Sequence, residues 1–303
     1  MPVGKWIVPV ATAALAMATA FAHAEDTDNP DTPPQFPTTV FAEGANSASV
    51  TVGDVTATVR LQRGAKPNPD TDKVWLHVTN GILPVAEASA PDSGFDVPDA
   101  EASIAEIDPG NRHPEVYFAA FSGGAHCCTK VIVAEEQPHG WVTVDVGEFD
   151  GGSDYLQDID HDGLAEIVTV DNHFLYTFDC YACSAAPLVI YTVRDGKVVD
   201  VSTDPRYLSA HRDWLAQLED SVDPSERWTS PGFLAGWVAT KVRLGEGAEA
   251  WKALKAHWDY AQDAGEETCL TGVDIDACPK GKIKVMKFPD RLKLFLDRNG
   301  YAS

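Results

Sequence analysis

Four acidic side chains fall within one short stretch of the chain, at a spacing that suits a calcium ion. The stretch reads D-I-D-H-D-G-L-A-E from Asp158 to Glu166, which puts carboxylates at positions 1, 3, 5 and 9. Calcium takes roughly six to eight oxygen ligands, and a backbone carbonyl at position 7 is a usual one. Gly163 permits the sharp turn that such a loop needs. The sequence therefore predicts a Ca²⁺ site with five ligand residues: Asp158, Asp160, Asp162, Leu164 and Glu166.

This stretch departs from an EF-hand, which requires a Glu at position 12 and a helix on each side. Position 12 is Thr169, and the β-branched run Ile167–Val170 predicts a strand directly after the loop. The loop resembles instead the calcium loops of FG-GAP and VCBS-type repeats, the blades of integrin-like β-propellers. That resemblance implies stacked β-structure with bound calcium. The alternative is a solvated acidic turn that holds no metal.

Six cysteines are the second group of residues that could take part in chemistry: Cys127, Cys128, Cys180, Cys183, Cys269 and Cys278. An even number in an exported protein indicates disulfides. Cys269 and Cys278 enclose a short polar loop, and we expect them to pair. The other four allow three patterns: 127–183 with 128–180, 127–180 with 128–183, or a vicinal bridge with a bridge inside C-x-x-C.

A metal or redox site is the alternative for the same segments. His126 with Cys127, Cys128, Cys180 and Cys183 could coordinate zinc or copper. The C-x-x-C motif of a thiol–disulfide active site normally lies at the start of a helix in a βαβ unit. A strand is predicted after Cys183, which argues against such a site. The chain contains no G-x-S-x-G elbow, no H-E-x-x-H motif and no phosphate-binding glycine loop. Catalytic activity is therefore left open, and no catalytic residue is assigned.

The N-terminus has the pattern of a secretory signal peptide over residues 1–24. Lys5 precedes an apolar segment, and Ala22-His23-Ala24 is a cleavage site of the A-x-A type. We therefore expect a periplasmic or secreted protein, with no later segment able to span a bilayer. The formal net charge of −23 makes nucleic acids and anionic membranes poor partners and favours cations or basic partners.

The pattern of hydrophobic residues predicts an α+β protein. Residues 25–39 are rich in Pro and Asp and are expected to be a disordered leader. Residues 40–203 contain short alternating segments that predict a mainly antiparallel β domain, either propeller-blade-like or a β-sandwich. Within it, residues 84–100 have no clear periodicity and are expected to form an acidic insertion. Residues 204–303 have helical periodicity and predict a helical C-terminal region.

The β region contains a weak internal repeat. With one extra residue in the first copy, Ile104–Val116 aligns with Leu156–Ile167, and Cys128 then corresponds to Cys180. The spacing is near that of a propeller blade and favours stacked β units with a disulfide between them. The first copy has Gly110 and Arg112 where the second has carboxylates, so only the second is predicted to hold calcium.

Three segments, at residues 115–128, 158–168 and 171–178, resemble an exported bacterial family of uncharacterised proteins. The resemblance covers roughly residues 104–205 and implies export and a β fold, with no substrate or reaction. Our functional prediction is a calcium-binding, non-enzymatic module that binds an envelope protein or glycan. The alternative is an envelope enzyme, either a hydrolase with an acidic cleft or a thiol or metal enzyme around His126. The sequence predicts no oligomeric state.

Overall fold

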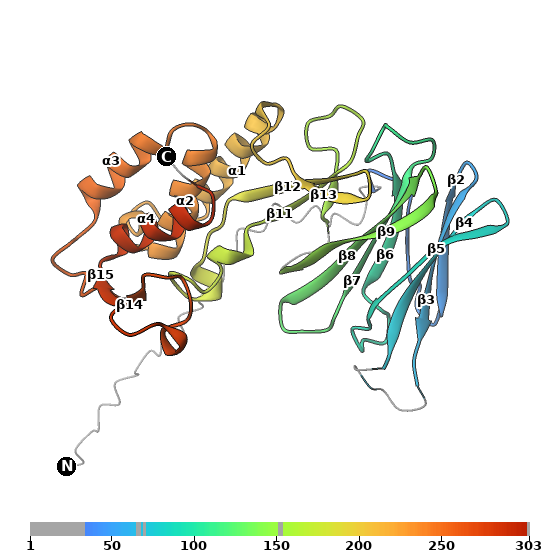
Figure 1. The fold of residues 1–303 in the computed structure, drawn as a ribbon, viewed down its shortest axis with the longest axis horizontal. Coiled ribbons are helices and arrows are strands. Elements are labelled where there is room, and N and C mark those ends of the chain that lie inside the picture. Colours follow the sequence, from blue (N-terminus) through green and yellow to red (C-terminus); the bar gives the residue numbers. More distant parts are fainter. Residues whose placement is uncertain (1–33, 65–67, 69–70, 151–153, 302–303) are drawn as a thin grey trace, which may run out of the picture.

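Strands occupy the first two thirds of the folded chain and helices the last third, as predicted for an α+β protein (Figure 1). The computed structural model describes residues 34–64, 68, 71–150 and 154–301. The predicted signal peptide, residues 1–24, lies outside the described residues. No helix among the described residues is long and apolar enough to cross a membrane.

Two antiparallel sheets pack face to face at the N-terminal end of the fold. Their facing side chains form one apolar core, to which Leu76 and Phe118 contribute from opposite sheets. Because the sheets do not close on themselves in the described part of the chain, this region is a sandwich rather than a barrel. The first sheet has the order β2 (Ser47–Val52), β3 (Val55–Gln62), β4 (Lys73–Asn80), β5 (Leu83–Pro91). The second has the order β1 (Thr38–Val40), β6 (Ala100–Ala105), β7 (Glu115–Phe121), β8 (Cys127–Gln137), β9 (Gly140–Asp150).

The second sheet is buried on both of its faces. Along β7, Val116 and Phe118 point into the sandwich core, whereas Tyr117 and Ala119 contribute to a separate core on the other side. Successive side chains of a strand point to opposite faces, so a strand that continues as V-Y-F-A-A-F after Glu115 suits a middle layer. The residues that cover this second face come largely from the third sheet, whose order is β10 (Leu156–Gln157), β11 (Glu166–Val170), β12 (Leu188–Arg194), β13 (Lys197–Asp200).

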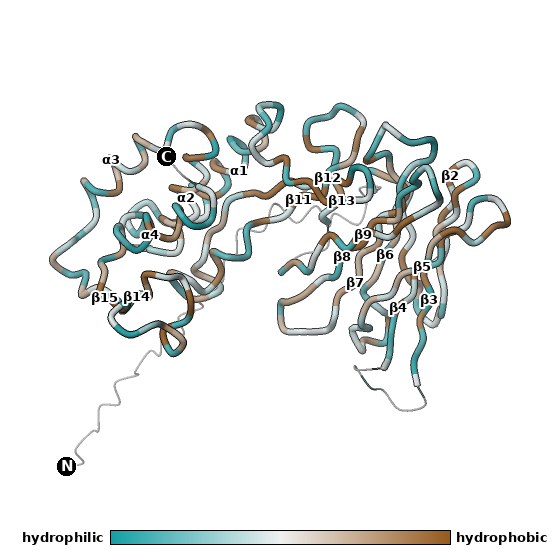
Figure 2. Tube along the Cα trace, viewed as in Figure 1, coloured by the Kyte–Doolittle hydropathy of each residue, from teal (hydrophilic) through white to brown (hydrophobic). Residues whose placement is uncertain are grey.

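The third sheet connects the β layers to the helices. Ile167 belongs to the core shared with the second sheet, and its neighbour Val168 belongs to the helical core. Hydrophobic residues accordingly run along β11 and β12 between the two halves of the molecule (Figure 2). The helices are α1 (Leu208–Asp220), α2 (Pro231–Arg243), α3 (Gly247–His257) and α4 (Phe288–Arg298), accompanied by the small hairpin β14 (Glu266–Cys269) and β15 (Ile283–Met286).

Two segments that were predicted to lack regular structure contain strands. The end of the predicted leader forms β1, where Thr38 pairs with Ser103 of β6. The prediction of an irregular insertion over residues 84–100 was wrong, because β5 runs from Leu83 to Pro91 and pairs with β4. This strand lies at the edge of its sheet, the position in which proline is tolerated. Burial does not alternate along β5, so period-two patterning gave no signal for this strand.

Candidate functional site

The acidic loop connects β10 to β11 and brings together three of its predicted ligands. One carboxylate oxygen from each of Asp158, Asp160 and Glu166 lies within 4.8 Å of the others. Charged oxygens at this separation repel one another, and a divalent cation between them removes that repulsion. The donor set consists of hard oxygens, which suits Ca²⁺ better than a softer metal.

Backbone conformation and hydrogen bonds shape this loop. His161 and Gly163 both have positive φ, at 62° and 89°. Asp158 accepts hydrogen bonds from the N–H groups of Asp162 and Gly163, at 3.0 and 3.1 Å. The carboxylate of Asp162 accepts a bond from Leu164 N–H at 2.9 Å, and Asp162 is not one of the three converging residues. The loop is therefore tightly turned, as Gly163 predicted. The side chain of Asp162 points toward the backbone of the loop at Leu164.

Glu166 is the buried member of the cluster, with 3% of its surface exposed. One of its oxygens accepts a hydrogen bond from Ile159 N–H at 3.2 Å, and the other accepts one from the Tyr207 hydroxyl at 3.1 Å. Burial, followed by the nearby charge of Asp160, raises the pKa of Glu166 to about 7. A bound cation would favour the ionised form of this carboxyl.

Arg206 is a neighbour of the loop that sequence reasoning missed. It lies in a short 3₁₀ helix, Pro205–Tyr207, between β13 and α1. Its guanidinium is 3.5 Å from a carboxylate oxygen of Asp162 and 4.0 Å from one of Asp160. Arg206 is more than forty residues from these aspartates in the sequence, so only the fold reveals that it supplies a positive charge beside the loop.

The internal repeat is present in the structure. Ile104 pairs with Val116 in the first unit as Leu156 pairs with Ile167 in the second. The carboxylate of Glu115 accepts a bond from Ile107 N–H at 2.7 Å, which repeats the contact that Glu166 makes. In place of a converging carboxylate, the first unit has the Asn111 side chain, which donates to Glu115 at 2.5 Å. An amide donor therefore satisfies the buried acid of the first unit.

The cysteine pairing differs from the one that the repeat favoured. The structure pairs Cys127 with Cys128 and Cys180 with Cys183, so the preference for a bridge between the two segments was wrong. The predicted bridge between Cys269 and Cys278 is present. Cys127 and Cys128 are the first two residues of β8, where its pairing with β9 is irregular. In the described part of the chain every cysteine is paired.

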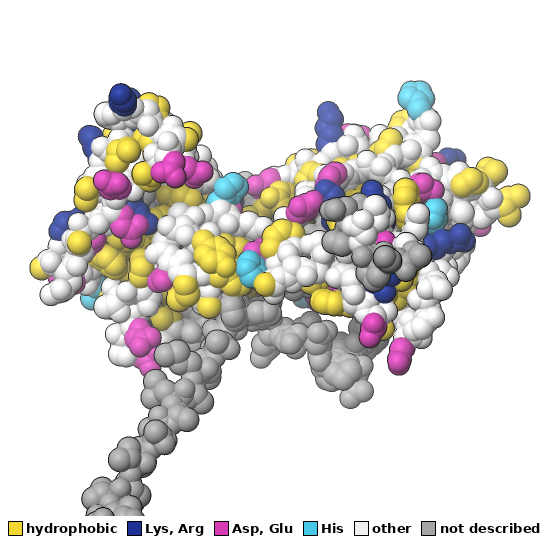
Figure 3. Space-filling view, turned by 90° about the horizontal axis from the view of Figure 1, so that it is seen from below, with side chains coloured by type: hydrophobic (Ala, Val, Ile, Leu, Met, Phe, Trp, Pro, Cys, Tyr) yellow, Lys and Arg dark blue, Asp and Glu magenta, His cyan; other side chains and the backbone are white. Residues whose placement is uncertain are grey.

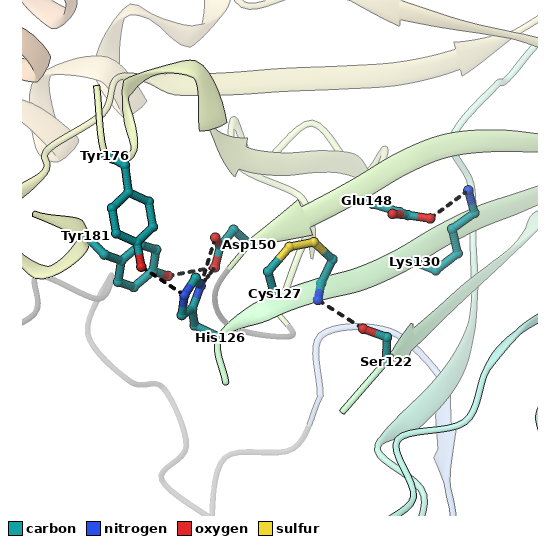
Figure 4. The surroundings of a disulfide bond; sticks show 9 residues. Ser122, His126, Cys127, Lys130, Glu148, Asp150, Tyr176 and Tyr181 are labelled. Carbon is teal, nitrogen blue, oxygen red and sulfur yellow. Dashed lines mark hydrogen bonds and ion pairs between the residues drawn. A yellow bond between two sulfur atoms is a disulfide. The ribbon is translucent and has the colours of Figure 1, made fainter. Parts of the chain in front are cut away.

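The two cysteine segments nevertheless meet, through His126 and two tyrosines (Figure 4). His126 Nδ1 lies 3.0 Å from both carboxylate oxygens of Asp150, and the Tyr181 hydroxyl donates to Asp150 at 2.7 Å. The imidazole stacks on the Tyr181 ring with centroids 4.0 Å apart, and its Nε2 is 3.2 Å from the Tyr176 hydroxyl. Asp150 thus orients the imidazole. Asp150 and the tyrosines were not predicted, because nothing in their spacing connects them to His126.

His173 contacts a carboxylate outside this cluster. Its Nδ1 lies 2.7 Å from Asp171, and its side chain is 73% exposed. The residues around the two cysteine segments therefore form a histidine–carboxylate–tyrosine cluster next to two disulfides.

Comparisons with known proteins identify relatives but no reaction. Residues 211–300 match the family model described as the sll0997 C-terminal domain. The chain is 34% identical over 261 residues to the probable thylakoid lumen protein sll0997 of Synechocystis, a match that covers 84% of this chain and 76% of that protein. It is 32% identical over 249 residues to the uncharacterized protein y4bJ of Sinorhizobium fredii, covering 80% of this chain but only 39% of that protein. No solved structure matches.

These matches bear on two predictions. The predicted location outside the cytoplasm is confirmed, because the cyanobacterial relative is named a probable thylakoid lumen protein, and the lumen is an exported compartment. The resemblance to an uncharacterised exported family is confirmed in the same way, whereas the comparisons give no support for FG-GAP or VCBS repeats.

Proposed function

Because the chain belongs to the family of the probable thylakoid lumen protein sll0997, we propose that it is an exported calcium-binding protein that serves as a binding module at the cell envelope. The observation that carries the calcium proposal is the convergence of Asp158, Asp160 and Glu166 within 4.8 Å. In the absence of a cation, this convergence costs electrostatic free energy, which the guanidinium of Arg206, 4.0 Å from Asp160, offsets in part.

Calcium at this loop would stabilise the connection between the β layers and the helices. The loop precedes β11, which contributes to both cores, and Glu166 accepts a hydrogen bond from Tyr207 just before α1 begins. An ion held by Asp158, Asp160 and Glu166 would fix this contact. The ion is therefore proposed as a structural element, and the partner, an envelope protein or a glycan, is expected to bind elsewhere on the surface.

Calorimetric titration of chelator-treated protein with Ca²⁺ tests the calcium part of the proposal. We expect one saturable site in the wild type and in Asp54→Asn, a control at an exposed turn, and no site in Asp160→Asn. Mg²⁺ should bind more weakly, because it demands near-ideal octahedral geometry. Equal calcium binding by wild type and Asp160→Asn would reject the assigned loop.

An envelope enzyme centred on His126 is the second candidate, and the contact between His126 and Asp150 is the observation that favours it. A carboxylate that orients an imidazole is a usual arrangement for general acid–base catalysis. Hydrolysis of a panel of esters and glycosides that is lost in His126→Gln would favour the enzyme. No hydrolysis by the wild type, together with calcium binding, would favour the binding module.

A further inference from the structure

A cavity of about 350 Å³ opens in the helical part of the fold, within the size range of small-molecule sites. Its lining comes from the segment between α3 and α4, the first turns of α2 and α4, the short 3₁₀ helix Arg227–Thr229, and Phe178. Apart from Phe178, the lining lies within the region that matches the sll0997 C-terminal domain. The cavity is separate from both the acidic loop and the His126 cluster.

Four aromatic side chains line this cavity: Phe178, Trp228, Trp258 and Phe288. The phenylalanines are buried, at 7% and 5% exposure, while the two indoles are only partly buried. The Trp258 ring lies 4.7 Å from Phe288, and the Trp228 ring stacks on His257 at 4.3 Å. Neighbouring rings therefore hold the aromatic walls in place, so a ligand would lose little free energy in ordering them.

The charged groups at the cavity are mainly acidic. Asp259, Asp263 and Glu266 line it, and Arg291 is its single basic residue. Arg291 is already engaged, because it forms an ion pair with Glu266 and lies 5.2 Å above the Phe178 ring. The two aspartates therefore leave an excess of negative charge beside the indoles.

Hydrogen bonds favour the ionised form of Asp263. It accepts one bond each from Trp258 Nε1, Phe288 N–H and Gly265 N–H, all at 2.8 Å. Burial opposes its ionisation, but these bonds and the charge of Lys287 outweigh burial and lower the pKa of Asp263. Lys287 does not line the cavity, and its ammonium donates to the Tyr260 carbonyl. The cavity thus keeps its negative charge at neutral pH.

We propose that this cavity binds a small organic cation, an ammonium group carried on an apolar frame. Indole faces attract cations through the ring quadrupole, and the nearby carboxylates add a favourable charge interaction. Anionic ligands are disfavoured by the same carboxylates. This inference rests on the proposed binding role and adds a small-molecule ligand to the envelope protein or glycan proposed above.

Choline and its uncharged isostere 3,3-dimethylbutan-1-ol test the proposal directly, with binding followed by indole fluorescence and calorimetry. We expect choline to bind at least about tenfold more tightly, which is within the range of cation–π contributions. Trp228→Ala should weaken choline binding by about the same factor. Asp259→Asn should weaken it several-fold. Trp251→Ala, which removes another partly buried indole of the helical core, is the matched control and should bind choline like the wild type.

Three results would overturn the proposal: no saturable choline binding, equal affinity for the two isosteres, or a neutral sugar that binds more tightly than either. Each titration is performed both with calcium and with a chelator. Calcium binding without choline binding rejects the cavity alone. Choline binding without a calcium response rejects the calcium loop alone.

Discussion

Glu115 occupies in the first β unit the position that Glu166 occupies in the second. Each is buried and is the first residue of a central strand. Each also accepts a hydrogen bond from the backbone N–H of an isoleucine, Ile107 for Glu115 and Ile159 for Glu166. The surroundings then differ, because Asn111 donates to Glu115 whereas Asp158 and Asp160 converge on Glu166. The same arrangement of strands thus holds a polar contact in the first β unit and a candidate ion site in the second.

Burial of Glu115 predicts a pH-dependent stability. Burial raises the pKa of Glu115 to about 7 in the folded protein, above its ordinary value. A raised folded-state pKa stabilises the fold below the unfolded-state pKa of about 4.3, and this stabilisation is lost as the pH rises to about 7. Glu115→Gln should remove a pH-dependent term on the order of 3 kcal/mol from the free energy of unfolding across that window.

Urea unfolding at several pH values measures this effect. Glu43→Gln, at an exposed position, serves as the control and should leave the pH profile unchanged. A profile for Glu115→Gln that is parallel to that of the wild type would show that Glu115 does not titrate in this range.

Arg206 is expected to weaken calcium binding, because its guanidinium lies beside Asp160 and Asp162. Arg206→Gln should raise calcium affinity by a few-fold, since exposed ion pairs contribute up to about 1 kcal/mol. The same change should lower the melting temperature in chelator. Calorimetry and thermal unfolding measure the two effects. Arg212→Gln, which removes an exposed arginine paired with Glu246, should alter neither calcium affinity nor its dependence on salt.

The three disulfides should contribute unequally to stability. Cys269 and Cys278 are nine residues apart in the sequence, and their bridge closes the loop between them. Replacing both with serine should lower the free energy of unfolding by about 2–3 kcal/mol. The bridge between Cys127 and Cys128 joins adjacent residues and restricts the unfolded chain least, so the corresponding double substitution should cost much less. Denaturant unfolding compares them.

Peptide mapping without reduction tests the pairing itself. It should recover Cys127 with Cys128 in one peptide and Cys180 with Cys183 in another. A peptide that links the two segments would contradict this pairing.

Local patterns were sufficient to predict much of this fold. The alternation in β3 and β4, the helical spacing of Leu215 and Leu218, and the glycine-centred turn of the acidic loop all depend on near neighbours in sequence. The register of the repeat was also recoverable, because buried residues at matching positions specify it.

The remaining features depend on contacts between distant segments. Arg206 reaches the acidic loop only because β13 returns beside β12, and Tyr176 and Tyr181 reach His126 only because the two cysteine segments meet. The aromatic cavity combines Phe178 with residues more than forty positions later. No pattern in the sequence distinguishes the buried ring of Phe288 from the partly buried rings of Trp228 and Trp258.

Figure 3 shows acidic side chains and hydrophobic side chains on both halves of the molecule, seen from below. With a formal net charge of −23, the protein has a general attraction for cations that a specific site must exceed. Nonspecific calcium binding therefore has to be separated from binding at the Asp158–Glu166 loop, and thermal stability makes this separation because weak surface binding stabilises the fold little.

The melting temperature of the wild type and of Asp160→Asn, each measured with chelator and with saturating Ca²⁺, tests the central claim most directly. At about 100 times the dissociation constant, calcium should stabilise the wild type by about 2.7 kcal/mol, a rise of about 5–10 °C. Asp54→Asn should respond like the wild type, and Asp160→Asn should not respond. A wild-type melting temperature that calcium leaves unchanged, or an equal rise in Asp160→Asn, would contradict a calcium ion at this loop.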